Sequence, residues 1–139
     1  MFTHVDHVGL AVRDLEAAIA LYSSCFGVSS WERILMPDRH MEVAVSHIGQ
    51  TLIELIAPTS AEAAFAKFLD DRGPGMHHMA YRVVDIAQAL EQLQQQGISL
   101  IDEQPRPGLH NTLVAFLHPK STLGVLIELV QHTTATQHV

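Results

Sequence analysis

The sequence predicts an α+β fold built from two tandem βαβββ modules, and two repeated features predict it. An apolar run preceded by a histidine and followed by a helix-type pattern occurs twice, with His7 and His78 as the corresponding histidines, 71 residues apart. The segment Thr51-Leu-Ile-Glu-Leu-Ile56 returns 74 residues later as Val125-Leu-Ile-Glu-Leu-Val130. Because both repeats keep the same order along the chain, one unit of strand, helix and three strands is used twice.

The first module is expected over about residues 4–58. Asp14 precedes apolar residues spaced by threes and fours, so it is suited to N-cap a helix, and Gly27 is suited to end that helix. A hairpin turn is expected at Gly49-Gln50. The strands of this module that follow the helix are expected at residues 32–37, 41–48 and 51–57.

The second module is expected over about residues 75–131, after a linker helix over about 59–73 that opens at Pro58. Asp85 and Gly97 repeat the cap and the stop of the first helix. The later strands are expected at residues 98–102, 112–118 and 124–131. The tail, residues 132–139, is polar and expected to fray, so the whole chain is expected to be a single domain.

Composition excludes several classes of function. The chain has 139 residues, 47% of them apolar and 17% charged, which is enough to close one core. Its net charge of −7 argues against a nucleic-acid partner, because binding to duplexes depends on Lys and Arg. Cys25 is the single cysteine, so no disulfide within the chain can form. The sequence shows no 18-residue apolar run and no signal-peptide pattern, so no membrane contact and a cytoplasmic location are expected.

Two glutamates in apolar strands point to a metal site. Glu54 and Glu128 each lie in the middle of a run of Leu, Ile and Val, where an ionised carboxylate is costly unless it is paired, protonated or bound to a metal. The alternative is an edge strand that turns its glutamate to water. If the modules pack about a pseudo-twofold axis, His7, Glu54, His78 and Glu128 converge. This N₂O₂ donor set suits a divalent ion such as Co, Ni, Mn, Fe or Zn.

Four segments carry a resemblance to a known family: residues 6–12, 75–80, 116–120 and 124–131. They make the chain similar to the vicinal oxygen chelate (glyoxalase/bleomycin resistance/dioxygenase) superfamily and, within it, to the methylmalonyl-CoA epimerase family. The resemblance implies a cupped mixed β-sheet around a metal site, a divalent ion (Co, Mn, Ni or Zn), an acyl-CoA substrate and a homodimer. His7, His78 and Glu128 match the ligand positions of the epimerase family, and Glu54 falls where its members carry Gln or Glu.

The epimerase resemblance implies interconversion of the 2R and 2S epimers of methylmalonyl-CoA through an enolate. Glu128 and Glu42 are the candidates for moving the proton, although an exposed hairpin glutamate is the competing interpretation of Glu42. Lys120 and His110 are the candidates for binding substrate. Weaker candidate cations are Arg39, Arg82 and Arg106.

Two other functions share this donor set or this fold. A glyoxalase I-like lactoylglutathione lyase would present the same His/Glu/His/Glu set, so the ligands alone do not separate it from an epimerase. The segment His118-Pro-Lys120 favours the epimerase. A metal-free binding protein of the bleomycin-resistance type would leave both strand glutamates without a metal.

Overall fold

The structure, a computed structural model, describes residues 1–133. It forms two compact units, His7–His77 and a second unit made of Met1–Asp6 together with the chain from His78 onward. The divisions fall inside the first and fifth strands. Compared with the predicted modules, the start of the first strand belongs to the unit that contains His78, and the start of the fifth strand belongs to the unit His7–His77. Among the described residues, no helix combines the length and the apolar character that a membrane span requires.

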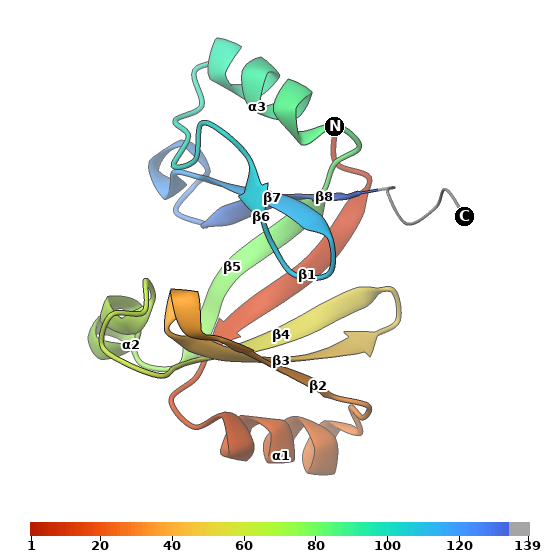
Figure 1. The fold of residues 1–139 in the computed structure, drawn as a ribbon, viewed down its shortest axis with the longest axis vertical. Helices are drawn as coiled ribbons and strands as arrows, with labels where there is room; N and C mark the ends of the chain where they lie inside the picture. The colour runs from red at the N-terminus through yellow and green to blue at the C-terminus, as the bar shows by residue number, and fades with distance from the viewer. Residues whose placement is uncertain (134–139) are drawn as a thin grey trace. The chain divides into compact units, whose positions relative to one another are not determined.

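The unit His7–His77 is a four-stranded mixed sheet in the order β2-β3-β4-β1, with helix α1 on one face (Figure 1). Strand β1 is parallel to β4, whereas β4 with β3 and β3 with β2 are antiparallel pairs. The elements are β1 (His4–Ala11), α1 (Leu15–Phe26), β2 (Glu32–Met36), the 3-10 turn η1 (Pro37–Arg39), β3 (Met41–Ile48), β4 (Thr51–Pro58) and α2 (Ala66–Arg72).

Helix α1 begins and ends where the sequence predicts. The Asp14 carboxylate accepts a hydrogen bond from the Ala17 N–H at 3.1 Å, which satisfies one of the unpaired donors of the first turn. Gly27 adopts φ 71°, a left-handed conformation that glycine enters without the steric cost of a Cβ. The helix packs onto β3 and β4 through a core of Leu15, Ala44, Ile53, Leu55 and Ala57.

The second unit repeats this topology in the order β6-β7-β8-β5. Strand β5 is parallel to β8, and β8 with β7 and β7 with β6 are antiparallel. Asp85 caps α3 by accepting from the Gln88 N–H at 3.1 Å, and the helix packs on the face of Ala115, Leu117 and Leu129. The elements are β5 (Gly75–Arg82), α3 (Ile86–Gln95), β6 (Arg106–Pro107), β7 (Thr112–Leu117), the 3-10 turn η2 (Pro119–Ser121) and β8 (Ile127–His132).

Two predicted elements differ from the structure. Helix α2 begins at Ala66, because residues 59–65 form successive turns. The strand expected at 98–102 is reduced to one isolated bridge at Leu100, because the N–H groups of Ile101 and Asp102 both donate to the Phe116 carbonyl and interrupt the ladder. The first strand after α3 is β6 instead.

The end of the chain differs in part from the prediction. His132, expected in the frayed tail, is the last residue of β8 and pairs with Thr112. The rest of that expectation, for residues 134–139, lies outside the described residues.

Candidate metal centre

His7 and Glu54 lie together in the unit His7–His77. The parallel register of β1 and β4 sets His7 opposite Leu52 and Gly9 opposite Glu54, so the imidazole and the carboxylate project from the same face. His7 Nε2 lies 3.6 Å from Glu54 Oε2, and the two side chains are 8% and 12% exposed. The carboxylate predicted to be buried in an apolar strand is therefore buried beside an imidazole.

His78 and Glu128 form the corresponding pair in the second unit. Strand β5 runs parallel to β8, with Ala80 opposite Glu128. His78 Nε2 lies 3.4 Å from Glu128 Oε1, and the side chains are 4% and 9% exposed. Phe116 stands directly opposite Glu128 in β7 and meets the His78 ring edge to face, with the ring centroids 5.9 Å apart.

The water-facing alternative for the two glutamates is wrong. Strand β4 lies between β3 and β1, and β8 lies between β7 and β5, so neither is an edge strand in its unit. A carboxylate this deeply buried is costly unless a charged or hydrogen-bonding partner accompanies it. Each one has a neighbouring imidazole, and carboxylate oxygen with imidazole nitrogen is a donor combination that divalent transition metals bind.

Glu42 lies on the other face of its sheet. In the β3–β4 register Val45 stands opposite Glu54 and Glu42 stands opposite Ala57, so Glu42 shares the face that packs on α1. There Arg33 donates two hydrogen bonds to the Glu42 carboxylate, each 3.2 Å long. The expectation that Glu42 moves the substrate proton together with Glu128 is therefore not supported, because the pleat of β3 directs its side chain to the face opposite to that of Glu54.

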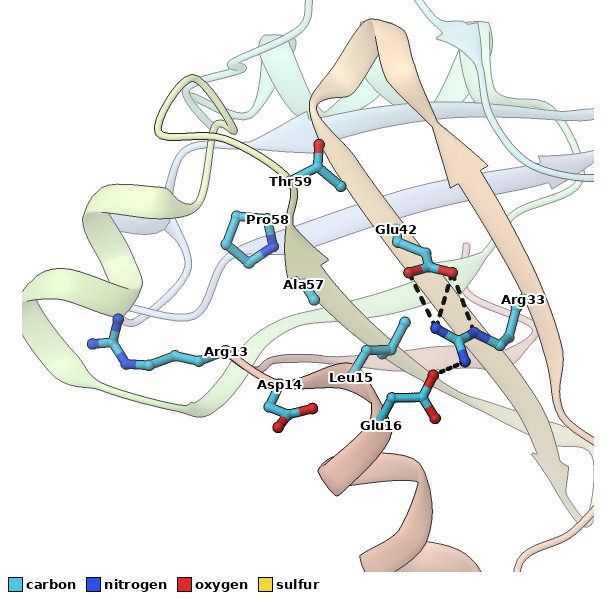
Figure 2. A pocket seen from close by; sticks show the side chains of 9 residues that line it. All are labelled: Arg13, Asp14, Leu15, Glu16, Arg33, Glu42, Ala57, Pro58 and Thr59. Atoms are coloured by element: carbon cyan, nitrogen blue, oxygen red, sulfur yellow. Dashed lines mark hydrogen bonds and ion pairs between the residues drawn. The ribbon is translucent and has the colours of Figure 1, made fainter.

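Glu42 belongs instead to an open hollow of about 410 Å³ near the start of α1 (Figure 2). The Arg33 guanidinium bridges Glu42 and Glu16 in this hollow, and hydrogen bonds from these carboxylates raise the pKa of Arg33 above its ordinary value. The Arg33 guanidinium thus pairs with both carboxylates, and the competing interpretation of Glu42 as a surface residue fits this arrangement better.

The two predicted substrate-binding residues lie in turns on either side of β7. Lys120 is exposed in η2, where its N–H donates to His118 Nδ1 at 3.1 Å. His110 is exposed in the turn between β6 and β7 and has φ 54°. Both residues are on the surface, as a role in binding substrate requires, and that role stays a prediction.

The sequence did not predict a second buried acid in the unit that contains His78. Asp6 is 5% exposed, and its Oδ1 lies 2.7 Å from His132 Nε2 and 3.3 Å from Arg82 Nη2. His132 was expected in the frayed tail, and Arg82 was one of the weaker candidate cations for substrate. The only signal in the sequence was an aspartate within the apolar first strand. In the structure Asp6 pairs with Arg82 at the end of β5 and with His132 at the end of β8, so the cluster connects three strands.

Comparison with known proteins decides the family. Residues 6–116 match the model of the glyoxalase/bleomycin resistance protein/dioxygenase superfamily. The chain belongs to this superfamily. The predicted fold class, two βαβββ modules of the vicinal oxygen chelate type, is thereby confirmed.

Several proteins similar to this chain over nearly its whole length are epimerases. The ethylmalonyl-CoA/methylmalonyl-CoA epimerase of Cereibacter sphaeroides is 36% identical over 133 residues, which is 94% of this chain and 99% of the relative. The crystal structure of methylmalonyl-CoA epimerase from Mycobacterium tuberculosis matches with a TM-score of 0.91 and 36% identity, covering 99% of this chain and 93% of that one. A methylmalonyl-CoA epimerase in complex with methylmalonyl-CoA and NH4+ matches with a TM-score of 0.90 and 29% identity, covering 96% of each chain.

Proposed function

We propose that this protein is a methylmalonyl-CoA epimerase, which interconverts the 2R and 2S epimers by removing the proton at C2 and delivering a proton to the opposite face of the resulting enolate. The observation that carries the proposal is the presence of two buried imidazole–carboxylate pairs, one in each unit, on the scaffold of chains that are methylmalonyl-CoA epimerases. The His118-Pro-Lys120 segment, which favours an epimerase over a glyoxalase I, supports the same choice.

The proposed metal ligands are His7, Glu54, His78 and Glu128. His7, Glu54 and His78 offer the donor types of a transition-metal centre, and Glu128 adds a second carboxylate. Two neutral imidazoles and two carboxylates carry a charge of about −2, which one divalent cation balances, and four protein donors leave coordination positions open. A bound ion of this kind (Co, Mn, Ni or Zn) supplies Lewis-acid stabilisation of the negative charge that develops on a substrate oxygen.

Glu128 is the proposed proton-transfer group. It is 7% exposed, so water is largely kept from its carboxylate, and Phe116 stands directly opposite it in β7. A carboxylate with so little exposure can accept the C2 proton, or donate one, on its own face of the substrate, and inversion requires proton delivery on the other face. Glu42 is not proposed as its counterpart, because its side chain lies on the α1 face and is paired with Arg33.

The test is proton exchange at C2 of methylmalonyl-CoA in deuterated buffer, followed by NMR with and without added Co, Mn, Ni or Zn. We expect exchange with at least one of these ions and its loss after chelation. Glu128→Gln should reduce exchange at least about 100-fold and should weaken metal binding measured by calorimetry. Glu91→Gln makes the same chemical change on the exposed side of α3 and should alter neither. Absence of exchange with every ion would refute the proposed function.

Two further properties stay predictions from the sequence. A homodimer follows from the family resemblance, and sedimentation equilibrium of the full chain would show a mass of about twice 15.3 kDa if it is right. A cytoplasmic location also stays a prediction, which fractionation of cells that express the protein would test.

A further inference from the structure

Arg106 projects from the same face of its sheet as Glu128. The β6–β7 register places Arg106 opposite Val114, and the β7–β8 register places Val114 opposite Val130 and Phe116 opposite Glu128. Residues directly opposite in neighbouring strands share a face, as do residues two apart in one strand. Arg106, Phe116 and Glu128 are therefore on one face of the second unit.

One aromatic ring separates Arg106 from His78. The Arg106 guanidinium carbon lies 5.6 Å from the centroid of the Phe116 ring, within the range of a cation–π contact. The same ring meets His78 edge to face with the centroids 5.9 Å apart. The Phe116 ring thus contacts both the guanidinium and the buried imidazole.

The side chain of Arg106 is supported from the other side by Asp102. Arg106 Nε lies 3.6 Å from Asp102 Oδ2, and this oxygen also accepts the Phe116 N–H at 2.8 Å. Asp102 therefore fixes the arginine relative to the strand that carries Phe116. The Nη groups of Arg106 carry four of the five N–H donors of its guanidinium, and the Arg106 side chain is 46% exposed.

We propose that Arg106 binds the free carboxylate of the acyl-CoA substrate and so selects dicarboxylic acyl groups, an inference that rests on the proposed function. The planar guanidinium matches a carboxylate with two parallel hydrogen bonds. Methylmalonyl-CoA carries its carboxylate on the reacting carbon, whereas its phosphates lie at the far end of the long pantetheine arm. Because one ring separates Arg106 from His78, the nearer anionic group is the carboxylate.

Other cations of the chain are placed for different contacts. Arg82 is paired with the buried carboxylate of Asp6, and Arg33 is held by acidic groups on the α1 face of the other unit. Lys120, on the exposed turn after β7, stays the candidate for a phosphate of the coenzyme. Arg106 is thus assigned to the acyl end and Lys120 to the coenzyme end.

The experiment compares two ligands on the full-length protein by calorimetry: methylmalonyl-CoA and propionyl-CoA, which lacks only the free carboxylate. Arg106→Gln should weaken methylmalonyl-CoA binding about 10- to 100-fold and leave propionyl-CoA binding unchanged. Arg106→Lys keeps the charge but loses the paired hydrogen bonds, and should fall between wild type and Gln. Lys67→Gln makes the same change in net charge on exposed α2 and should affect neither ligand.

Each other outcome overturns the inference in a recognisable way. Equal weakening for both ligands would mean that Arg106 binds a phosphate, and no weakening for either would mean that it binds neither group. If the wild type catalyses C2 exchange while Arg106→Gln retains its preference for methylmalonyl-CoA, the inference fails and the proposed function stands. A wild type that does not bind methylmalonyl-CoA refutes both. Circular dichroism of each variant confirms that it is folded.

Discussion

Gly108 is the position where a single methyl group should have a large and measurable cost. It follows β6, one residue after Pro107, and opens the turn that leads into β7. A Cβ built on Gly108 would lie 2.5 Å from Thr112 Oγ1 and 2.7 Å from Val114 Cγ1. Separations this short are well inside van der Waals contact, so Gly108→Ala requires one of these side chains or the backbone to move.

Neither neighbour can move without further loss. Thr112 and Val114 are 8% and 4% exposed, and both are β-branched residues of a strand, with restricted χ1 angles. Thr112 Oγ1 also donates to the Leu109 carbonyl at 2.6 Å, and a displaced hydroxyl would lose that bond. Overpacking of this kind costs about 1–3 kcal/mol, and a lost hydrogen bond adds about 1 kcal/mol. We expect the free energy of unfolding to fall by about 2–4 kcal/mol.

Urea unfolding followed by circular dichroism measures this cost, with Gly75→Ala as the matched control. A Cβ at Gly75 meets nothing within 4 Å and its φ is not in the left-handed region, so the same substitution there should change the free energy of unfolding by less than about 0.5 kcal/mol. A Gly108→Ala protein as stable as Gly75→Ala would refute the reasoning, because it would show that the turn relaxes freely around the new methyl group.

Three further predictions concern stability. Leu123 is 99% exposed with φ 63°, so Leu123→Gly should raise the free energy of unfolding by about 0.5–1 kcal/mol in urea titration, since it relieves left-handed strain and removes no buried contact; a destabilised variant contradicts this. Burial lowers the pKa of His77 below its ordinary 6.5. In protein freed of metal by a chelator, the imidazole of the unfolded state is therefore protonated at a higher pH than that of the folded state. The free energy of unfolding should fall as the pH drops below about 6.5. His77→Phe, which retains an aromatic ring beside Phe65 and Phe68, should flatten that decline in unfolding experiments from pH 7 to 5; an unchanged slope would show that other groups cause it. Adding a divalent ion that binds should raise the melting temperature of the chelated protein in proportion to log concentration above Kd, and Glu54→Gln should reduce that rise.

The sequence predicted local structure well where one residue type has one physical role. Asp14 and Asp85 as helix caps and Gly27 as a helix stop are confirmed, because capping depends on contacts within a few residues of the chain. The same local argument failed for the linker, where a pattern of apolar spacing predicted a helix from residue 59 and turns replace its first part. The N-cap position of α2 is Phe65, which makes no side-chain capping hydrogen bond, so no residue type marked the start of this helix in the sequence.

The candidate site shows the same division between local and distant information. The burial of Glu54 and Glu128 followed from their apolar neighbours in the sequence, and each is found beside the histidine of its own repeat. The side on which Glu42 lies depends on the register of β3 against β4, and the position of Arg106 depends on a strand only two residues long. The two-residue turn predicted at Gly49-Gln50 implies the observed pairing of Ile48 with Thr51, whereas no sequence pattern predicts the strand that carries Arg106.

By itself the sequence determined that a βαβββ unit is used twice, that its helices are capped, and that each half contains a buried acid with a histidine, because periodicity, capping and desolvation act over short distances along the chain. Tertiary structure decided which side chains share a face. That choice placed Glu42 with Arg33, Asp6 with His132, and Arg106 beside the aromatic ring that contacts His78. The physical reason is that a one-residue shift in strand pairing reverses every side chain, and only the packed sheet fixes that register.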